Sequence, residues 1–233
     1  MSVQPASINA LDSRRADRLR GLLIVGAAFV LCLLVSVWAK RRARPEVSVP
    51  PGPPTTVGVV GFPKQVDAIK TLSRARELTP RNLLRSIVAD GVASDGNLDL
   101  TSTGHVRYSF QSAAGQGPQP AREPGTLARH PYCGRQSVNL DKAGLIVELD
   151  TADASCAPRP NDPLPEPRCT LAGVWAYAAQ RGVDKSRVAH IEYYRASAGP
   201  AWSFVAGGGR NRFTLYGDCK RELDAREAVN IGP

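Results

Sequence analysis

The histidines are the first residues to examine for chemistry, because imidazole binds metals and moves protons near neutral pH. His130 stands three residues before Cys133, but zinc needs three or four ligands, and no second pair accompanies these two residues. His105 and His190 fall within strand-like patterns, where we expect them on the surface or facing a partner. The sequence therefore predicts no metal site and no cofactor.

The carboxylates offer no clear acid–base pair either. Glu148 and Asp150 are two residues apart and share one face of a strand, which favours a solvated acidic edge. Glu192 could act as a single acid, and the glycine run 207–209 precedes no helix, so it predicts a hairpin loop and not a phosphate cradle. The sequence contains no Gly-x-Ser-x-Gly motif. No catalytic residue is predicted, and a protein without enzymatic activity is favoured over an enzyme.

Two tyrosines, Tyr194 and Tyr216, are candidates for partner contacts. Both occupy positions that would face outward from predicted strands. Tyrosine on an open sheet face suits protein–protein contacts, because it offers apolar area together with a hydroxyl. Packing of the two rings against a loop is the alternative interpretation.

Five cysteines occur, and all but Cys32 follow residue 39. An even number in that part of the chain indicates two disulfides, which persist in oxidising compartments. A hairpin over 132–150 would bring Cys133 within reach of Cys156, and joining Cys169 to Cys219 would clip together the ends of the last folded unit. We expect these two bonds, with four buried free thiols as the alternative.

Residues 21–39, GLLIVGAAFVLCLLVSVWA, contain no charged side chain. As a helix this segment would span roughly 28 Å, close to the hydrocarbon core of a bilayer. A cleaved signal peptide and a helix buried in a soluble core are the alternatives. We predict an uncleaved single-pass membrane anchor in the lipid bilayer, flanked at the headgroups by Arg18, Arg20, Trp38, Lys40, Arg41 and Arg42.

The orientation of this anchor follows from the cysteines, because basic residues are equally numerous before and after it. Disulfides would place the C-terminal part outside the cytoplasm. We therefore expect a cytoplasmic tail at 1–20 and a protein of the cell inner membrane with its C-terminal domain in the periplasm.

The net charge of +9 does not predict a nucleic-acid partner. Residues 1–46 hold eight Lys and Arg against three Asp and Glu, so more than half of the excess charge lies around the apolar segment. The remainder is spread over the rest of the chain with both signs interspersed, as on a solvated globular surface.

Residues 40–64 read as a basic and proline-rich linker, and 65–155 as a first α+β unit. Helical spacing of apolar residues over 65–92 predicts two helices divided at Thr79-Pro80, the second ending at Gly91. Period-two patterns and turn residues then predict strands at 98–101, 105–111, 132–140 and 145–150.

The second unit, 156–233, repeats this order. It contains a predicted helix at 171–181 and strands at 187–195, 201–205 and 212–216. The fold class expected is α+β, with an N-terminal transmembrane helix followed by two similar helix-plus-antiparallel-sheet units braced by disulfides.

A helix followed by a hairpin and a further strand resembles the PepSY domains. Residues 171–216 carry the resemblance, with Ile191-Glu192-Tyr193-Tyr194 and Ala201-Trp202-Ser203-Phe204 at the sheet positions. The resemblance implies a small module of a secreted or membrane-tethered bacterial protein, sometimes present in tandem. It transfers no functional residue to this chain.

We predict a membrane-anchored binding or scaffolding protein from the anchor, the proline-rich linker and the lack of a catalytic motif. Its partner would be another envelope protein or a cell-wall component. The alternative is a membrane-anchored envelope hydrolase whose site no local motif reveals.

Overall fold

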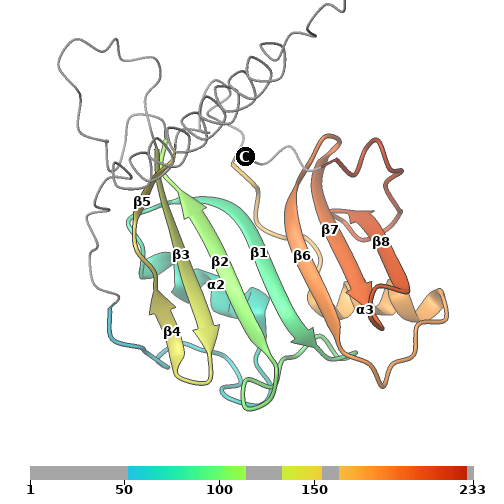
Figure 1. Cartoon of the computed structure of the whole chain (residues 1–233), viewed down its shortest axis with the longest axis horizontal. Helices are drawn as coiled ribbons and strands as arrows, with labels where there is room; N and C mark the ends of the chain where they lie inside the picture. Colours follow the sequence, from blue (N-terminus) through green and yellow to red (C-terminus); the bar gives the residue numbers. More distant parts are fainter. Residues whose placement is uncertain (1–51, 114–132, 154–162, 230–233) are drawn as a thin grey trace, which may run out of the picture. The chain divides into compact units, whose positions relative to one another are not determined.

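The computed structural model describes residues 52–113, 133–153 and 163–229, and most of them lie in one antiparallel sheet. Its strands follow the order β4-β3-β2-β1-β6-β7-β8, and β5 pairs with β3 beside this path (Figure 1). The strands are β1 (Leu83–Val92), β2 (His105–Gln111), β3 (Cys133–Asp141), β4 (Gly144–Val147), β5 (Thr151–Asp153), β6 (Ala189–Ala196), β7 (Gly199–Ala206) and β8 (Asn211–Tyr216).

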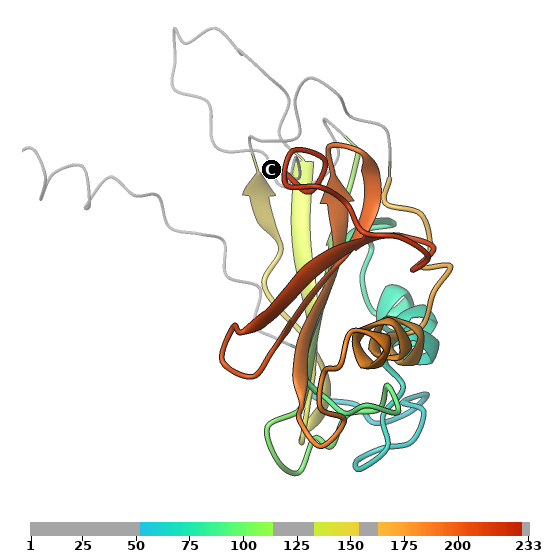
Figure 2. The ribbon, with the colours of Figure 1, turned by 90° about the vertical axis from the view of Figure 1, so that its right-hand side faces the viewer.

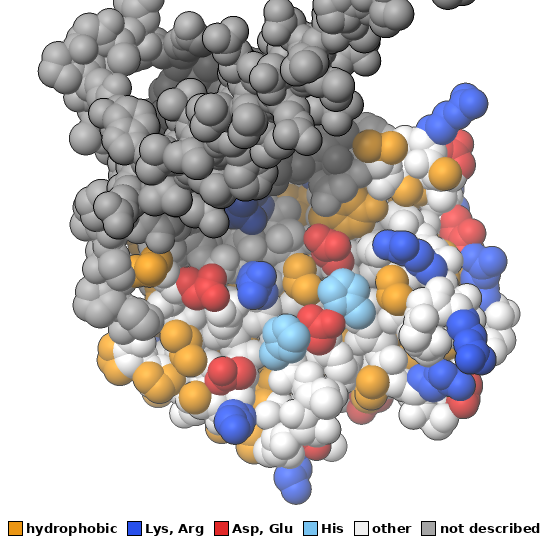
Figure 3. Space-filling view, in the orientation of Figure 1, with side chains coloured by type: hydrophobic (Ala, Val, Ile, Leu, Met, Phe, Trp, Pro, Cys, Tyr) orange, Lys and Arg blue, Asp and Glu red, His pale blue; other side chains and the backbone are white. Residues whose placement is uncertain are grey.

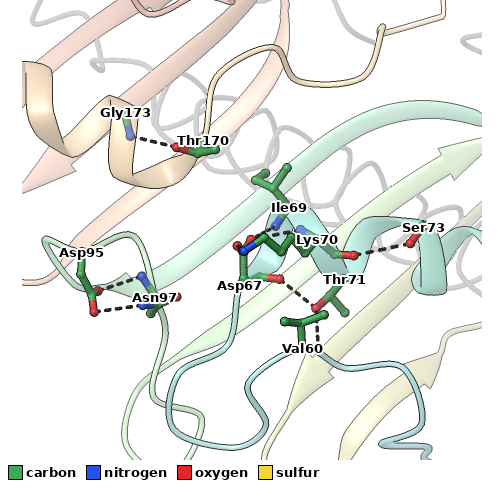
Figure 4. A network of polar contacts seen from close by, with 10 residues as sticks. All are labelled: Val60, Asp67, Ile69, Lys70, Thr71, Ser73, Asp95, Asn97, Thr170 and Gly173. Atoms are coloured by element: carbon green, nitrogen blue, oxygen red, sulfur yellow. Dashed lines mark hydrogen bonds and ion pairs between the residues drawn. The ribbon is translucent and has the colours of Figure 1, made fainter.

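Two helices, α2 (Ala68–Glu77) and α3 (Leu171–Gln180), lie on the same side of the sheet (Figure 2). Each begins at a side chain that accepts hydrogen bonds from unpaired backbone N–H groups of the first turn. The Asp67 carboxylate accepts from two of them in α2, and the Thr170 hydroxyl accepts from the Gly173 N–H in α3 (Figure 4).

The core lies between these helices and the sheet. Trp175 of α3 packs edge-on against Phe204 of β7, with 5.0 Å between the ring centres. The Tyr108 hydroxyl of β2 donates to the Ala68 carbonyl of α2 at 2.8 Å. The Trp175 Nε1–H donates to the Val92 carbonyl of β1. The polar groups of the two buried side chains, Tyr108 and Trp175, therefore both have hydrogen-bond partners.

The structure corrects the expected fold class. The described chain is mainly β, with two ten-residue helices, and not an α+β protein of two separate units. The first strands of the two expected units, 65–155 and 156–233, pair directly, with Ile87 opposite Tyr193. Because β1 and β6 are neighbours, all described strands belong to a single continuous sheet.

The second helix expected between Pro80 and Gly91 is also wrong, because this segment is strand β1. Its pairing with β2 shifts between Leu84 and Ser86, and its pairing with β6 shifts again before Val92. Each irregularity adds a residue between inward-facing side chains. The apolar residues consequently recur at a spacing that imitates a helix.

Two of the β-hairpins predicted by local patterns, β3–β4 and β7–β8, are confirmed. Leu140 of β3 faces Leu145 of β4, and Asp141 faces Gly144 at the turn. The glycine run 207–209 joins β7 to β8. All three residues have positive φ angles of 63–89°, a conformation that residues with a side chain rarely adopt. The segment 98–101 is no strand: Leu98 makes only isolated bridges, to Val66 and Val92.

No helix among the described residues is long and apolar enough to cross a membrane. The anchor predicted at 21–39 lies outside these residues. So do its predicted flanks, Arg18, Arg20, Trp38, Lys40, Arg41 and Arg42.

Candidate functional site

The face of the sheet opposite α2 and α3 carries two neighbouring rows of polar residues. In one row, His105 of β2 stands opposite Asp90 of β1. In the next row, Val88 of β1 has Arg107 of β2 on one side and Glu192 of β6 on the other. Histidine and acidic side chains gather over the middle of this face (Figure 3).

Asp90 lies between two histidines of different strands. Its Oδ1 is 2.6 Å from His190 Nδ1, and its Oδ2 is 3.1 Å from His105 Nε2. An ionised carboxylate only accepts hydrogen bonds, so the His190 Nδ1–H donates to Asp90, whereas His105 lies within ion-pair distance of it. The carboxylate thus orients His190 and leaves its Nε2, together with the exposed imidazole of His105, for hydrogen bonds with a ligand.

Glu192 adds a carboxylate that the fold does not neutralise. Its side chain is half-buried, and it makes no hydrogen bond with another described residue. Burial raises the pKa of Glu192 above the ordinary value of a carboxyl group, and the charge of nearby His190 opposes this shift. A half-buried carboxylate without a hydrogen bond from another described residue is unfavourable for folding alone, which makes Glu192 a candidate for recognition.

A second polar group extends the rows toward β4. The Arg107 Nε–H donates to Asn139 Oδ1 at 3.3 Å, and the Asn139 amide donates to the Glu148 carboxylate. Hydrogen-bonding groups therefore continue from β6 through β1, β2 and β3 to the end of β4. The area is larger than a catalytic centre needs and suits contact with an extended polar partner.

The chemistry of the histidine–aspartate cluster favours binding over catalysis. The side chains of His105, Asp90 and His190 are 53%, 31% and 39% exposed. Exclusion of water strengthens the electrostatic effects that stabilise a transition state, and such exposure works against it. Within the described ranges, no group of three or more histidine, cysteine or acidic side chains is arranged to hold a metal ion.

Replacing Glu192 by glutamine tests whether burial of this carboxylate lowers the free energy of unfolding. Because burial raises its folded-state pKa, the wild type loses stability as pH rises through that value, whereas glutamine does not titrate. We expect E192Q to be more stable at pH 7 by roughly 0.5 kcal/mol after screening by solvent. Urea unfolding should show no such gain below about pH 4, where the carboxyl is protonated in both states.

The matched control for this measurement is Glu77→Gln. Glu77 forms an exposed ion pair with Arg74 on α2, and such pairs contribute little to stability. E77Q should therefore lack the stabilisation at pH 7. If E192Q raised the free energy of unfolding by the same amount at pH 7 and below about pH 4, burial of the charged carboxylate would not be the cause.

The two tyrosines predicted as partner contacts are engaged within the chain. Tyr194 is only 6% exposed, and its hydroxyl donates to the Ala228 carbonyl at 2.9 Å. The Tyr216 hydroxyl donates to the Glu227 carboxylate at 2.7 Å. The exposure expected for Tyr194 is wrong and the loop-packing alternative is correct, because the chain after β8 folds back over the ends of these strands.

The expected bond between Cys169 and Cys219 is confirmed. It joins the residue before the N-cap of α3 to the loop after β8. Cys133 is also disulfide-bonded, and its expected partner, Cys156, lies outside the described residues. Gly173 leaves room for the Cys169–Cys219 bond, since a Cβ there would come within 2.6 Å of Cys169 Sγ.

The solvated acidic edge expected at Glu148 and Asp150 is not found. Asp150 accepts from both Nε and Nη2 of Arg81, and its side chain is 16% exposed. Glu148 is bound by Asn139. The first residue of the zinc pair considered above, His130, lies outside the described residues.

Sequence reasoning missed Asp90 and Arg107 as members of the site. Asp90 fell within the wrongly expected helix, and Arg107 was one exposed position in a strand. The pairing of His190 with Asp90 spans 100 residues, so no local motif could reveal it. The available signal was the polar alternation of β2 and β6, which had already suggested that His105 and His190 face outward.

Comparisons with known proteins identify no relative for this chain. No family model matches it, and no curated protein or solved structure shows significant similarity.

Proposed function

We propose that this chain is a membrane-anchored binding protein that presents the polar face of its sheet to a partner outside the cytoplasm. The observation that carries the proposal is the Asp90 cluster, in which one carboxylate orients two exposed imidazoles beside the unneutralised Glu192. The anchor at 21–39 and the proline-rich linker would hold this face away from the bilayer.

Disulfide bonding supports the placement outside the cytoplasm. Cys133, Cys169 and Cys219, which are all the cysteines in the described part of the chain, are oxidised. Reducing compartments keep such cysteines as thiols. The resemblance of 171–216 to PepSY modules implies the same setting.

The partner of this proposal is another envelope protein or a cell-wall component, and no nucleic acid. Acidic and basic groups alternate on the sheet face, with Asp90 and Glu192 close to Arg107 and the histidines. A surface that binds the phosphate backbone needs a continuous basic patch, which this mixture does not provide.

Site-specific photo-crosslinking tests the proposal. A photoreactive amino acid placed at His105 or Arg107 of the full-length chain in cells should trap a discrete adduct. The same amino acid at Ser73 or Ala176, exposed positions of the two helices, is the matched control and should not. Equal trapping from both faces, or none from the sheet, would contradict it.

A membrane-anchored hydrolase is the second candidate, because His190 with Asp90 resembles a base held by its orienting carboxylate. It requires turnover of an ester, peptide or glycan substrate that disappears in the His190→Ala variant. We expect purified full-length protein to show no hydrolysis that depends on His190, whereas loss of a measurable activity in H190A would favour the hydrolase.

A further inference from the structure

A pocket of about 330 Å³ lies away from the polar rows, between the segment before α3 and the loop after β8. Arg168 and Glu166 come from the first wall, Asp218 and Arg221 come from the second, and Tyr216 is the last residue of β8. Tyr193 of β6 lines it between them. A volume near this size suits a small molecule or the end of a peptide.

The disulfide fixes the two walls of this pocket relative to each other. Cys169 directly follows Arg168, and Cys219 directly follows Asp218. Backbone hydrogen bonds tighten the second wall, with Gly217 N–H donating to the Pro200 carbonyl and Cys219 N–H to the Tyr216 carbonyl. The walls are thus held in place before any ligand arrives, which lowers the entropy lost on binding.

Arg221 is positioned with its charge still available. Its guanidinium stacks over the Tyr216 ring at 3.8 Å from the ring centre. The ring is held in turn by its hydroxyl, which donates to Glu227. Stacking orients a guanidinium through its face and leaves the N–H groups at its edge free to donate.

Arg168 contributes a second cation near the Tyr193 hydroxyl. Burial raises the pKa of this hydroxyl to about 12, and the charges of Arg195 and Arg168 oppose the shift. Neither Arg168 nor Arg221 forms an ion pair with another described residue. Two guanidinium groups therefore line one pocket without a counter-charge from any other described residue.

The acidic residues of the pocket set the charge of the ligand. Glu166 is already neutralised by Arg76, with Nη1 2.6 Å from Oε1. Asp218 accepts a backbone hydrogen bond from Lys220 and has no cationic side chain bound to it in the described structure. Counting Arg76 with its partner Glu166, the charged groups at the pocket leave one net positive charge, which favours an anion over an uncharged ligand.

We propose that this disulfide-braced pocket binds a small ligand through a single carboxylate group held by Arg168 and Arg221. A planar carboxylate matches the paired donors of a guanidinium, and hydrogen bonds between charged groups are stronger than neutral ones. The aromatic and proline side chains of Tyr193, Tyr216, Pro165 and Pro200 receive the apolar remainder of the ligand.

The test compares N-acetylalanine with its uncharged methyl amide on the full-length protein, by calorimetry and ligand-detected NMR at low ionic strength. We expect the acid to bind at least about tenfold more tightly than the amide, since only the acid engages both arginines. Inorganic phosphate offers anionic oxygens without an apolar remainder for the tyrosine and proline side chains, and it should bind more weakly than the acid.

The variants Arg168→Gln and Arg221→Gln locate the site. Each should weaken binding of the acid, and the double variant should abolish the preference for the acid over the amide. Arg187→Gln, an exposed arginine outside the pocket, is the matched control and should bind as the wild type does.

The comparison on the wild-type protein keeps the proposal testable if a variant does not fold. Equal affinity for acid and amide, tighter binding of phosphate, or no binding of any probe would overturn the proposal. Unchanged binding in the folded double variant would overturn it as well. These outcomes are independent of crosslinking at His105 and Arg107, so the two proposals can fail separately.

Discussion

Replacing Cys169 and Cys219 together by serine is expected to lower the free energy of unfolding by about 4 kcal/mol. The bond joins residues 50 positions apart, and closing a loop of that length removes much of the freedom of the unfolded chain. It also secures the loop after β8, which otherwise depends on backbone hydrogen bonds at Tyr216, Gly217 and Leu223. Chemical unfolding without reductant measures the loss.

The matched control for this variant is full reduction. When every disulfide is reduced, wild type and C169S/C219S both lack the bond, so their free energies of unfolding should coincide. A double variant as stable as the oxidised wild type would contradict the prediction. Binding of N-acetylalanine should also weaken in the variant, because the bond joins the two walls that carry Arg168 and Arg221.

Elements of the fold that depend on local signals could be predicted from the sequence. Turn residues and period-two alternation placed the β3–β4 hairpin with Leu140 opposite Leu145. The helical spacing of apolar residues over 171–181 placed α3 within one residue of its observed end. Such features need only a few neighbouring residues.

Strand β1 shows why the rest of the fold could not be predicted. Its buried residues Leu84, Ile87, Ala89 and Val92 are spaced by three, two and three, because the pairing slips at both ends of the strand. That spacing fits a helix as well as a bulged strand. Because β1 was expected to be a helix, no predicted strand joined residues 65–155 to residues 156–233. Two separate units were therefore expected, whereas the structure has one sheet.

The candidate sites depend on contacts that are remote in sequence. His190 and Asp90 meet only because β6 pairs with β1, and Arg168 and Arg221 line one pocket only because the chain after β8 returns to the segment before α3. Sequence alone did suggest that His105 and His190 face outward and that Cys169 binds Cys219. It could not show which acidic and basic groups lie beside them.

Trp175→Ala is expected to lower the free energy of unfolding by about 4 kcal/mol, because deleting a fully buried indole leaves a large cavity. Trp175 is 1% exposed and stands between α3 and the sheet, in edge-on contact with Phe204. Its Nε1–H donates to the Val92 carbonyl at 3.1 Å. The substitution therefore removes both the apolar contact and the partner of a buried carbonyl at the end of β1.

Trp175→Phe separates these two contributions. It keeps most of the ring contact with Phe204 but removes the Nε1–H that donates to the Val92 carbonyl, so we expect a loss of about 2 kcal/mol, between wild type and W175A. Tyr177→Phe on the same helix is the matched control and should change stability by less than about 0.5 kcal/mol, because it keeps the ring and removes a hydroxyl that bonds to no other described residue. If W175F unfolded at the same urea concentration as the wild type, the hydrogen bond to β1 would not hold α3 on the sheet. Docking of α3 would then depend on the apolar contact alone.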